Sequence, residues 1–300
     1  GYGEALLLGN LILLFAMALK QRLAAAEAPS RLWPWFALWG FLVGCGLWAN
    51  GLTLVYSFPA GVYLLWSIWK HRSIWKYHRA WLVGAALAAL AGFVLGSLPW
   101  WVYAVSQGPD RLVLELLGNA VAVEQDSWLV RTANHLVNFL LLGLSVTFGL
   151  RPPWEVRWLA LPLIPAILII WLAILGFSIR QIFRRIAVRD EIALLLGVIA
   201  TLIAGFLFTP FGIDPSGRYF LPLAAPLALL AAWALPQLTF RFPRQTWLAP
   251  LVIVLIIGYQ FWGTLQCALR FPPGLTTQFY APAVIDHRAD AELIDFLTRE

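Results

Sequence analysis

The sequence is poor in charge. Asp, Glu, Lys and Arg make up only 12% of the 300 residues, whereas hydrophobic residues make up 61%. Soluble domains carry about 25% charged residues, so this composition excludes an ordinary water-soluble fold. Long apolar runs recur from one end of the chain to the other, and the mean hydropathy is +0.78. We therefore predict an all-α fold, a polytopic bundle of transmembrane helices in a cell membrane.

The chain is also poor in cysteine and in the common catalytic motifs. Its two cysteines, Cys45 and Cys267, lie inside or at the edge of apolar segments, which excludes a disulfide framework and a cysteine-based metal site. There is no internal repeat, Walker-type phosphate loop, Gly-x-Ser-x-Gly motif or zinc pattern. Almost no ionisable residue lies inside the apolar segments, which argues against a proton relay through the bilayer. Functional chemistry is therefore expected at the outer ends of the helices.

Nine apolar segments are present, and a helix needs ~20 residues to cross a bilayer. Lys and Arg residues cluster in the short loops after the first, third and sixth segments and before the last one. If these loops are cytoplasmic, the chain follows the positive-inside rule. The segments are residues 5–19, 32–49, 51–69, 80–105, 135–150, 158–179, 191–211, 219–238 and 247–269.

The segment at 135–150 is short, and a crossing there would move the basic cluster at 180–189 to the outside. We therefore expect residues 106–157 to form one outer loop with a re-entrant or interfacial helix in its middle. This interpretation gives about eight crossings with both chain ends outside, and a true ninth crossing is the alternative. Polar residues of this loop are expected mainly to face solvent, among them Asp126, Arg131 and His135.

The basic stretch at 70–79 carries interleaved aromatic residues. In a short loop between two spans, this mixture favours binding to the anionic headgroups of membrane lipids over binding to nucleic acid. We therefore predict membrane lipids, and no nucleic acid, as partners of this loop.

The two ends of the chain suggest a fragment of a larger protein. The sequence begins at Gly1, directly before an apolar run, and ends at Glu300 within an amphipathic pattern. Residues 1–269 are predicted to form a partial transmembrane domain. Residues 270–300 are predicted to contain a linker, marked by Pro272-Pro273-Gly274, and the start of a soluble extracytoplasmic domain.

A polar loop, Thr209-Pro-Phe-Gly-Ile-Asp-Pro-Ser-Gly-Arg218-Tyr-Phe-Leu-Pro222, separates two long apolar segments. Its prolines and glycines rule out a continuous helix. Arg218 stands at the start of the second segment, near the predicted membrane boundary, where a cation suits a lipid phosphate. The alternative is that Arg218 pairs with Asp214 or extends to lipid headgroups.

Four features taken together resemble the integral-membrane glycosyltransferases of the GT-C fold. The resemblance is to the branch that includes protein O-mannosyltransferases and the aminoarabinose transferase of lipid A. The first two features are Gly1-Tyr-Gly-Glu4-Ala-Leu-Leu-Leu-Gly9 and the glycine-punctuated span Trp39-Gly-Phe-Leu-Val-Gly44-Cys-Gly-Leu-Trp-Ala-Asn50. The others are Gly217-Arg218-Tyr219-Phe-Leu-Pro222-Leu and a final span that leads into an outer domain.

The resemblance implies transfer of a sugar from a polyprenyl-phosphate donor to a lipid, protein or glycan acceptor outside the cytoplasm. The general-base Asp of such enzymes would lie upstream of this chain, after a first span, so the catalytic residue is unknown and the fragment itself is expected to be inactive. No cofactor or metal ligand is assigned, and a divalent metal is left open. Glu4 is the candidate catalytic residue, and the candidate substrate-binding residues are Arg218, Tyr219, Asp214 and Asn50.

Structural roles are the alternatives at each candidate. Glu4 would cap its helix, Asn50 would form a turn, and Tyr219 would be an aromatic anchor at the membrane interface. The rival function is a polytopic lipid or polysaccharide transporter or flippase, in which Arg218 and Asp214 gate a headgroup without glycosyl transfer. A membrane scaffold without catalytic activity is a third interpretation.

Overall fold

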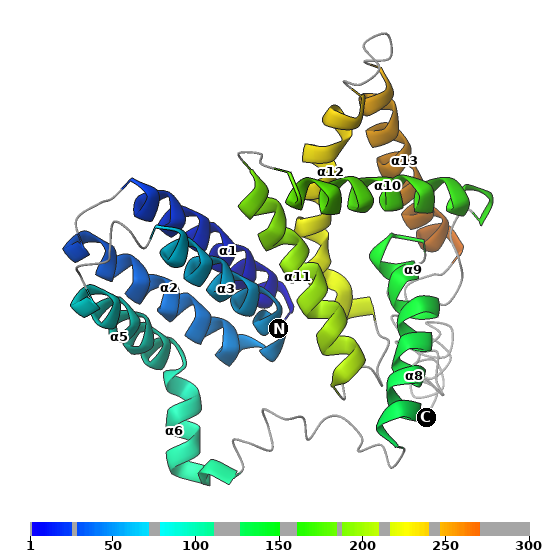
Figure 1. Ribbon diagram of the computed structural model, residues 1–300. Coiled ribbons are helices and arrows are strands. Elements are labelled where there is room, and N and C mark those ends of the chain that lie inside the picture. The colour runs from blue at the N-terminus through cyan, green and yellow to red at the C-terminus, as the bar shows by residue number, and fades with distance from the viewer. Residues whose placement is uncertain are drawn as a thin grey trace, which may run out of the picture.

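The computed structural model describes residues 2–25, 29–71, 79–110, 127–150, 161–184, 188–209, 217–239 and 247–270, and no strand occurs in these ranges. The chain folds into helices throughout them (Figure 1). The helices of the first half are α1 (Tyr2–Ala24), α2 (Pro29–Ala49), η1 (Gly51–Thr53), α3 (Leu54–Lys70), α5 (Arg79–Gly96), α6 (Leu98–Gln107), α8 (Trp128–Asn138), η2 (Phe139–Gly143) and α9 (Leu144–Thr147). Those of the second half are η3 (Leu161–Leu163), α10 (Ile164–Ile182), α11 (Arg189–Phe208), η5 (Gly217–Leu223), α12 (Ala224–Thr239) and α13 (Leu248–Arg270).

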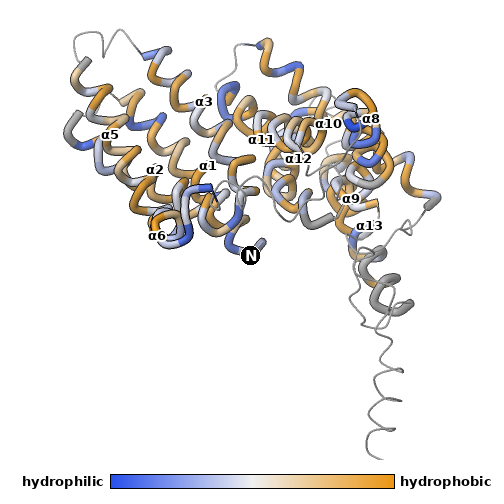
Figure 2. Tube along the Cα trace, turned by 90° about the horizontal axis from the view of Figure 1, so that it is seen from below, coloured by the Kyte–Doolittle hydropathy of each residue, from blue (hydrophilic) through white to orange (hydrophobic). Residues whose placement is uncertain are grey.

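These helices have the length and composition of membrane spans. Within the described residues, 7 helices are long and apolar enough to cross a bilayer, and a bent pair raises the total to 8. Figure 2 shows most helices coloured as apolar along much of their length. Large apolar side chains such as Leu7, Leu65 and Ile169 are exposed on the outer surface, where lipid would cover them. The chain is therefore a helical membrane protein, as the composition predicted.

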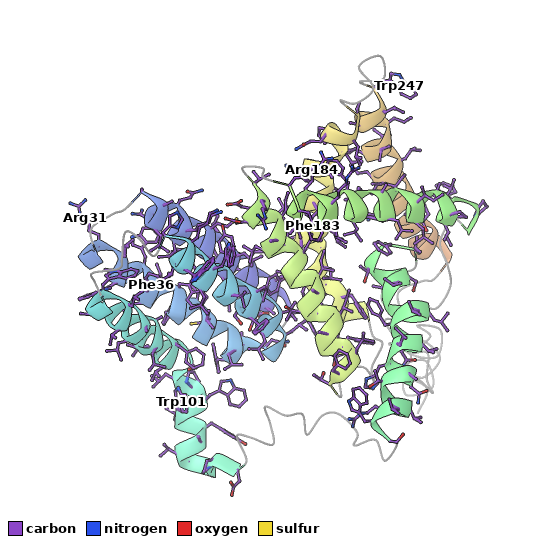
Figure 3. The ribbon with its side chains drawn as sticks, viewed as in Figure 1. Arg31, Phe36, Trp101, Phe183, Arg184 and Trp247 are labelled. Carbon is purple, nitrogen blue, oxygen red and sulfur yellow. The ribbon has the colours of Figure 1, made fainter. Side chains whose placement is uncertain are left out.

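The predicted span at 80–105 is not straight. It is divided into α5 and α6, which are bent by 63° at their junction. Pro99 begins the new helix and has no backbone N–H to continue the hydrogen bonding of α5. Ser97 stabilises the bend, because its hydroxyl donates to the carbonyl of Phe93 at 2.7 Å and accepts from the indole of Trp101 at 3.0 Å. Figure 3 shows Trp101 on α6, just beyond this junction.

The segment predicted to be a re-entrant or interfacial helix is longer than its hydropathy pattern indicated. Helices α8, η2 and α9 run continuously from Trp128 to Thr147, with one π-helical turn in the middle, and together have the length of a span. This length suits the alternative of a true crossing. The predicted number of crossings and the side on which each loop lies remain predictions, because length and composition do not establish them.

Helices α2 and α5 lie side by side (Figure 1) and pack backbone against backbone. A Cβ atom built on Gly40 would overlap the carbonyl oxygen of Ala89, and one built on Gly92 would overlap that of Ala37. Gly44 and Gly96, one turn further along each helix, are equally close to the opposing backbone. Small residues four apart allow two membrane helices to approach this closely, and the gain is van der Waals contact along both helices.

Tyr56 connects the first three helices to the second half of the chain. It is fully buried, and its ring fills the space beside Gly9 of α1, where a Cβ would overlap the ring. Its hydroxyl donates to the carbonyl of Pro222 in η5 at 3.1 Å. An aromatic cluster continues this core, with the ring centroids of Phe206 and Phe220 5.2 Å apart. One core therefore extends from α1 to α12.

Candidate functional site

The start of α1 and the helical turn η5 lie against each other. The rings of Tyr2 and Tyr219 meet edge to face, with centroids 6.3 Å apart. These residues are separated by most of the chain, yet they belong to the two segments that contain Glu4 and Arg218. The buried contact from Tyr56 to Pro222 holds the same junction from the inside. The structure thus brings two of the segments that carry the resemblance to one end of the bundle.

Glu4 is exposed and lies in the first turn of α1. A carboxylate at this position is favoured by the positive end of the helix dipole, as the structural alternative expected. Tyr219 is half-buried against Tyr2, so its ring serves as a packing residue at this junction.

Asn50 forms a turn, as its alternative predicted. It is the N-cap of η1, and its side-chain oxygen accepts a hydrogen bond from the backbone N–H of Leu52 at 2.9 Å. The hydroxyl of Thr53 donates to the carbonyl of Asn50 at 2.9 Å and tightens the same turn. The amide nitrogen of Asn50 is the part of its side chain that this turn does not use.

Several predicted features lie outside the described residues. Asp214 is in the range 210–216, so its predicted pairing with Arg218 cannot be placed. The backbone of Arg218 belongs to η5, directly before Tyr219. The start of the predicted soluble domain, beyond Arg270, lies outside the described residues as well.

His135 does not face solvent, contrary to expectation. It is 1% exposed, and its Nδ1 lies 3.0 Å from the carbonyl oxygen of Leu207 on α11. Nearby, the rings of Trp128 and Phe208 stack with an interplanar angle of 6°. His135 is therefore buried because α8 packs along the end of α11. The polar sequence around His135 did not indicate this packing.

The opposite end of the bundle holds a charged cluster that the sequence did not reveal. Lys20 of α1 contacts both acidic residues at the start of α11, Glu191 at 2.6 Å and Asp190 at 3.1 Å. Lys70 of α3 contacts the same oxygen of Asp190 at 3.0 Å. The hydroxyl of Tyr63 donates to the Oε1 atom of Glu191 at 3.2 Å. We call these five residues the charged cluster.

The charged cluster joins three helices at one point. The side chains of Lys20 and Asp190 are only 14% and 13% exposed, so water screens their attraction less than it would at an open surface. Lys70 is 52% exposed and its contact with Asp190 is weaker for that reason. The only sequence signal was the pair of acidic residues that begins an otherwise apolar run.

A groove of about 400 Å³ lies beside the charged cluster, between α3 and α11. Its walls are mainly apolar, and Arg189 and Asp190 form its charged end. The remaining lining residues are Phe58, Pro59, Val62, Tyr63, Trp66, Ile182, Ala193, Leu194, Gly197, Ala200 and Thr201. A second cavity of about 490 Å³, between α2, α3 and α5, is lined by apolar residues, with the indole of Trp39 contributing one polar atom.

Within the part of the chain that the structure describes, no group of three or more His, Cys, Asp or Glu residues is arranged to hold a metal ion.

Comparisons with protein-family models, with curated proteins and with solved structures found no match to this chain. The two ends of the bundle, one with the residues predicted from sequence and one with the charged cluster and its groove, are therefore interpreted from their own chemistry.

Proposed function

We propose that the protein is a membrane glycosyltransferase that transfers a sugar from a polyprenyl-phosphate donor to an acceptor on the extracytoplasmic face. The observation that carries the proposal is the contact of Tyr2 with Tyr219, at 6.3 Å between ring centroids. It holds the turn that contains Glu4 beside the turn that contains Arg218. Two segments that supply a glutamate and an arginine, held together at one end of a membrane bundle, suit a reaction between a hydroxyl and a lipid-linked phosphate ester.

The proposed reaction replaces one bond to the anomeric carbon of the sugar by another. The acceptor hydroxyl attacks that carbon, and the bond to the polyprenyl phosphate breaks. Negative charge grows on the departing phosphate, where the guanidinium of Arg218 would stabilise it through charge-assisted hydrogen bonds. The proton of the acceptor passes to a carboxylate base. Glu4 would orient a hydroxyl of the acceptor or the sugar, and the base itself is unassigned.

The remaining predicted residues have supporting roles in this proposal. Tyr219 would stack on the donor, Asp214 would orient Arg218, and the amide of Asn50 would bind a sugar hydroxyl. The acceptor class is a lipid, a protein or a glycan, and a divalent metal remains open. All of these roles require that η5 lies at the extracytoplasmic end of the bundle.

The proposal is tested by sugar transfer in membranes that contain the full-length protein. A polyprenyl-phosphate donor with a labelled sugar is supplied, and transfer to endogenous acceptors is counted. Arg218→Ala should lower transfer by roughly one to two orders of magnitude, because one charge-assisted interaction is worth about 1.5–3 kcal/mol. Arg218→Lys should retain part of the activity. Arg31→Gln, a change at an exposed arginine at the start of α2, is the matched control.

Unchanged transfer by Arg218→Ala would contradict the role of this residue. The rival function, a transporter or flippase, predicts a different product. In that case a lipid with a labelled headgroup would move across the membrane and be recovered chemically unchanged, with no labelled acceptor formed.

A further inference from the structure

The shape of the groove between α3 and α11 follows from unequal residue sizes on its two walls. On α3, Phe58, Val62 and Trp66 stand four residues apart and therefore share one face of the helix. They are 65%, 51% and 47% exposed. On α11 the facing residues are small, and both Ala193 and Ala200 are exposed. Large side chains opposite small ones leave a long apolar recess that opens to the outside of the bundle.

The two helices approach each other closely at Gly197, which also lines the recess. A Cβ built on Gly197 would lie 3.1 Å from the Cβ of Pro59, so the absence of a side chain at Gly197 allows this close approach. Leu194, a large residue of α11 in the lining, is buried, whereas Ala193 and Ala200 form the exposed part of this wall. The volume of about 400 Å³ falls in the range of about 300–1,000 Å³ that is typical of ligand sites.

One end of the groove carries a surplus positive charge. Lys20 and Lys70 are matched by the carboxylates of Asp190 and Glu191, at 2.6–3.1 Å. Arg189 adds a third cation, is exposed, and lines the groove. None of the ion pairs found among the described residues involves its guanidinium. The cluster and Arg189 together therefore have a net charge of about +1, counted from ordinary side-chain protonation at neutral pH.

The charged end lies at a depth suited to a lipid headgroup. Arg189 begins the candidate span α11, and Lys70 ends α3. Trp66 and Trp69, whose ring centroids are 4.9 Å apart, lie in the last turn of α3, as expected of tryptophans at a membrane interface. The apolar part of the groove extends from this level toward the middle of the bundle. Phe58 lies eight residues from Trp66, which is about 12 Å along the helix.

We propose that this groove binds one anionic phospholipid, with its phosphodiester on Arg189 and an acyl chain along the apolar wall of α3. A guanidinium offers paired N–H donors that match two phosphate oxygens. The carboxylate of Asp190, which also lines the groove, is held by the two lysines and so repels the phosphate less. A lipid with a single net negative charge complements the surplus charge, whereas a phosphatidylcholine headgroup adds a cation that the site does not need.

This lipid site is separate from the proposed catalytic end. Lys20 follows Glu4 by sixteen residues of α1, which is about 24 Å along the helix axis. The binding of the phospholipid therefore does not depend on glycosyl transfer, and each can fail while the other holds. A lipid bound there would join α3 and α11, which the ion pairs connect only at one end.

Retention of lipid by the purified protein tests the proposal. The full chain is equilibrated with equal amounts of phosphatidylglycerol and phosphatidylcholine in mixed micelles, and the lipids that stay bound are counted by native mass spectrometry. Wild type should retain one phosphatidylglycerol in preference to phosphatidylcholine. Arg189→Gln should lower the preference roughly fivefold, the value of one basic residue at an anionic surface. Arg31→Gln is the control. Figure 3 shows Arg31 near the start of α2, pointing away from the other helices.

A second variant tests the groove itself. Ala193→Phe fills the recess from its exposed small wall and should abolish retention of the lipid while thermal stability in detergent stays near that of wild type. Normal retention in this variant would overturn the groove as the binding site. If Arg31→Gln and Arg189→Gln lowered the lipid preference equally, the lipid would be held only by general attraction to the basic surface, and the proposal would also be overturned. Preferential retention of polyprenyl phosphate over phosphatidylglycerol would overturn the assignment of the occupant.

Discussion

The α2–α5 pair and the α3–α11 pair represent two ways for membrane helices to associate. In the first, glycines on both helices bring the backbones into direct contact, as at Gly40 with Ala89 and Gly92 with Ala37. In the second, small residues occur on α11 alone, and the large residues of α3 project beside them. The first pair is close-packed where its glycines face the opposing backbone. The second leaves a groove and carries polar contacts at one end.

The comparison indicates that the effect of a small residue on helix packing depends on the side chains of the facing helix. Between two membrane helices there is no large hydrophobic driving force, because lipid is as apolar as the helices. Small residues facing small residues increase van der Waals contact. Between α3 and α11 the large side chains are about half exposed or more and do not fill the space beside the small ones, which leaves room for lipid or a ligand.

The largest expected effect is at the close-packed pair. Gly92→Leu places a side chain where the carbonyl of Ala37 lies, so α2 and α5 must separate. We expect destabilisation of about 3 kcal/mol or more, at the upper end of overpacking effects. Gly176→Leu on α10 is the matched control, since nothing lies within 4 Å of a Cβ at that position. Thermal unfolding of both variants in detergent measures the difference, and equal midpoints would contradict the packing.

An intermediate effect is expected at the charged cluster. Lys20→Met removes the cation that contacts both Asp190 and Glu191, leaving partly buried carboxylates with fewer partners. We expect the free energy of unfolding to fall by about 2 kcal/mol. Removing one partner of an ion pair that is shielded from water destabilises a protein more than removing one partner of an exposed pair. Lys70→Met should cost less than about 1 kcal/mol, since its side chain is 52% exposed. Unfolding by denaturant would report both, and a larger loss for Lys70→Met would reverse the order.

An effect smaller than that of Lys20→Met is expected at the contact of α3 with η5. Tyr56→Phe removes only the hydroxyl that donates to the carbonyl of Pro222, and the ring stays in place beside Gly9. We expect a loss of about 1 kcal/mol, the typical net value of one neutral hydrogen bond. Tyr103→Phe on α6, away from this junction, serves as the comparison. Equal unfolding free energies for the two variants would show that this hydrogen bond contributes nothing.

The positions of the helices were easier to predict from the sequence than the way in which the helices pack against one another. Among the described residues, hydropathy found most of the long apolar helices near their observed positions, because burial in lipid requires a long apolar run whatever its neighbours. It missed the bend at Ser97, since Leu98-Pro99 is apolar and a hydropathy average does not register a missing N–H. It also treated residues 135–150 as a short segment, because the polar residues of α8 hid the continuation of the helix.

The candidate sites were predicted unequally for a similar reason. Glu4, Asn50, Arg218 and Tyr219 were identified because each interrupts or borders an apolar run. The pairing of Lys20 with Glu191 joins residues 171 positions apart, and no local pattern encodes it. The turn made by Asn50 was predictable as an alternative, because Asn followed by Gly favours a tight turn.

The sequence alone determined that this chain is a membrane protein built of helices, since only helices satisfy backbone hydrogen bonds within one apolar segment. The tertiary structure decided which faces meet. It paired the glycines of α2 and α5, placed Tyr2 against Tyr219, and joined three helices through the charged cluster. It also left a groove where large side chains of α3 stand opposite small ones of α11. These outcomes depend on contacts between distant residues, whose complementarity becomes visible only when the helices are packed.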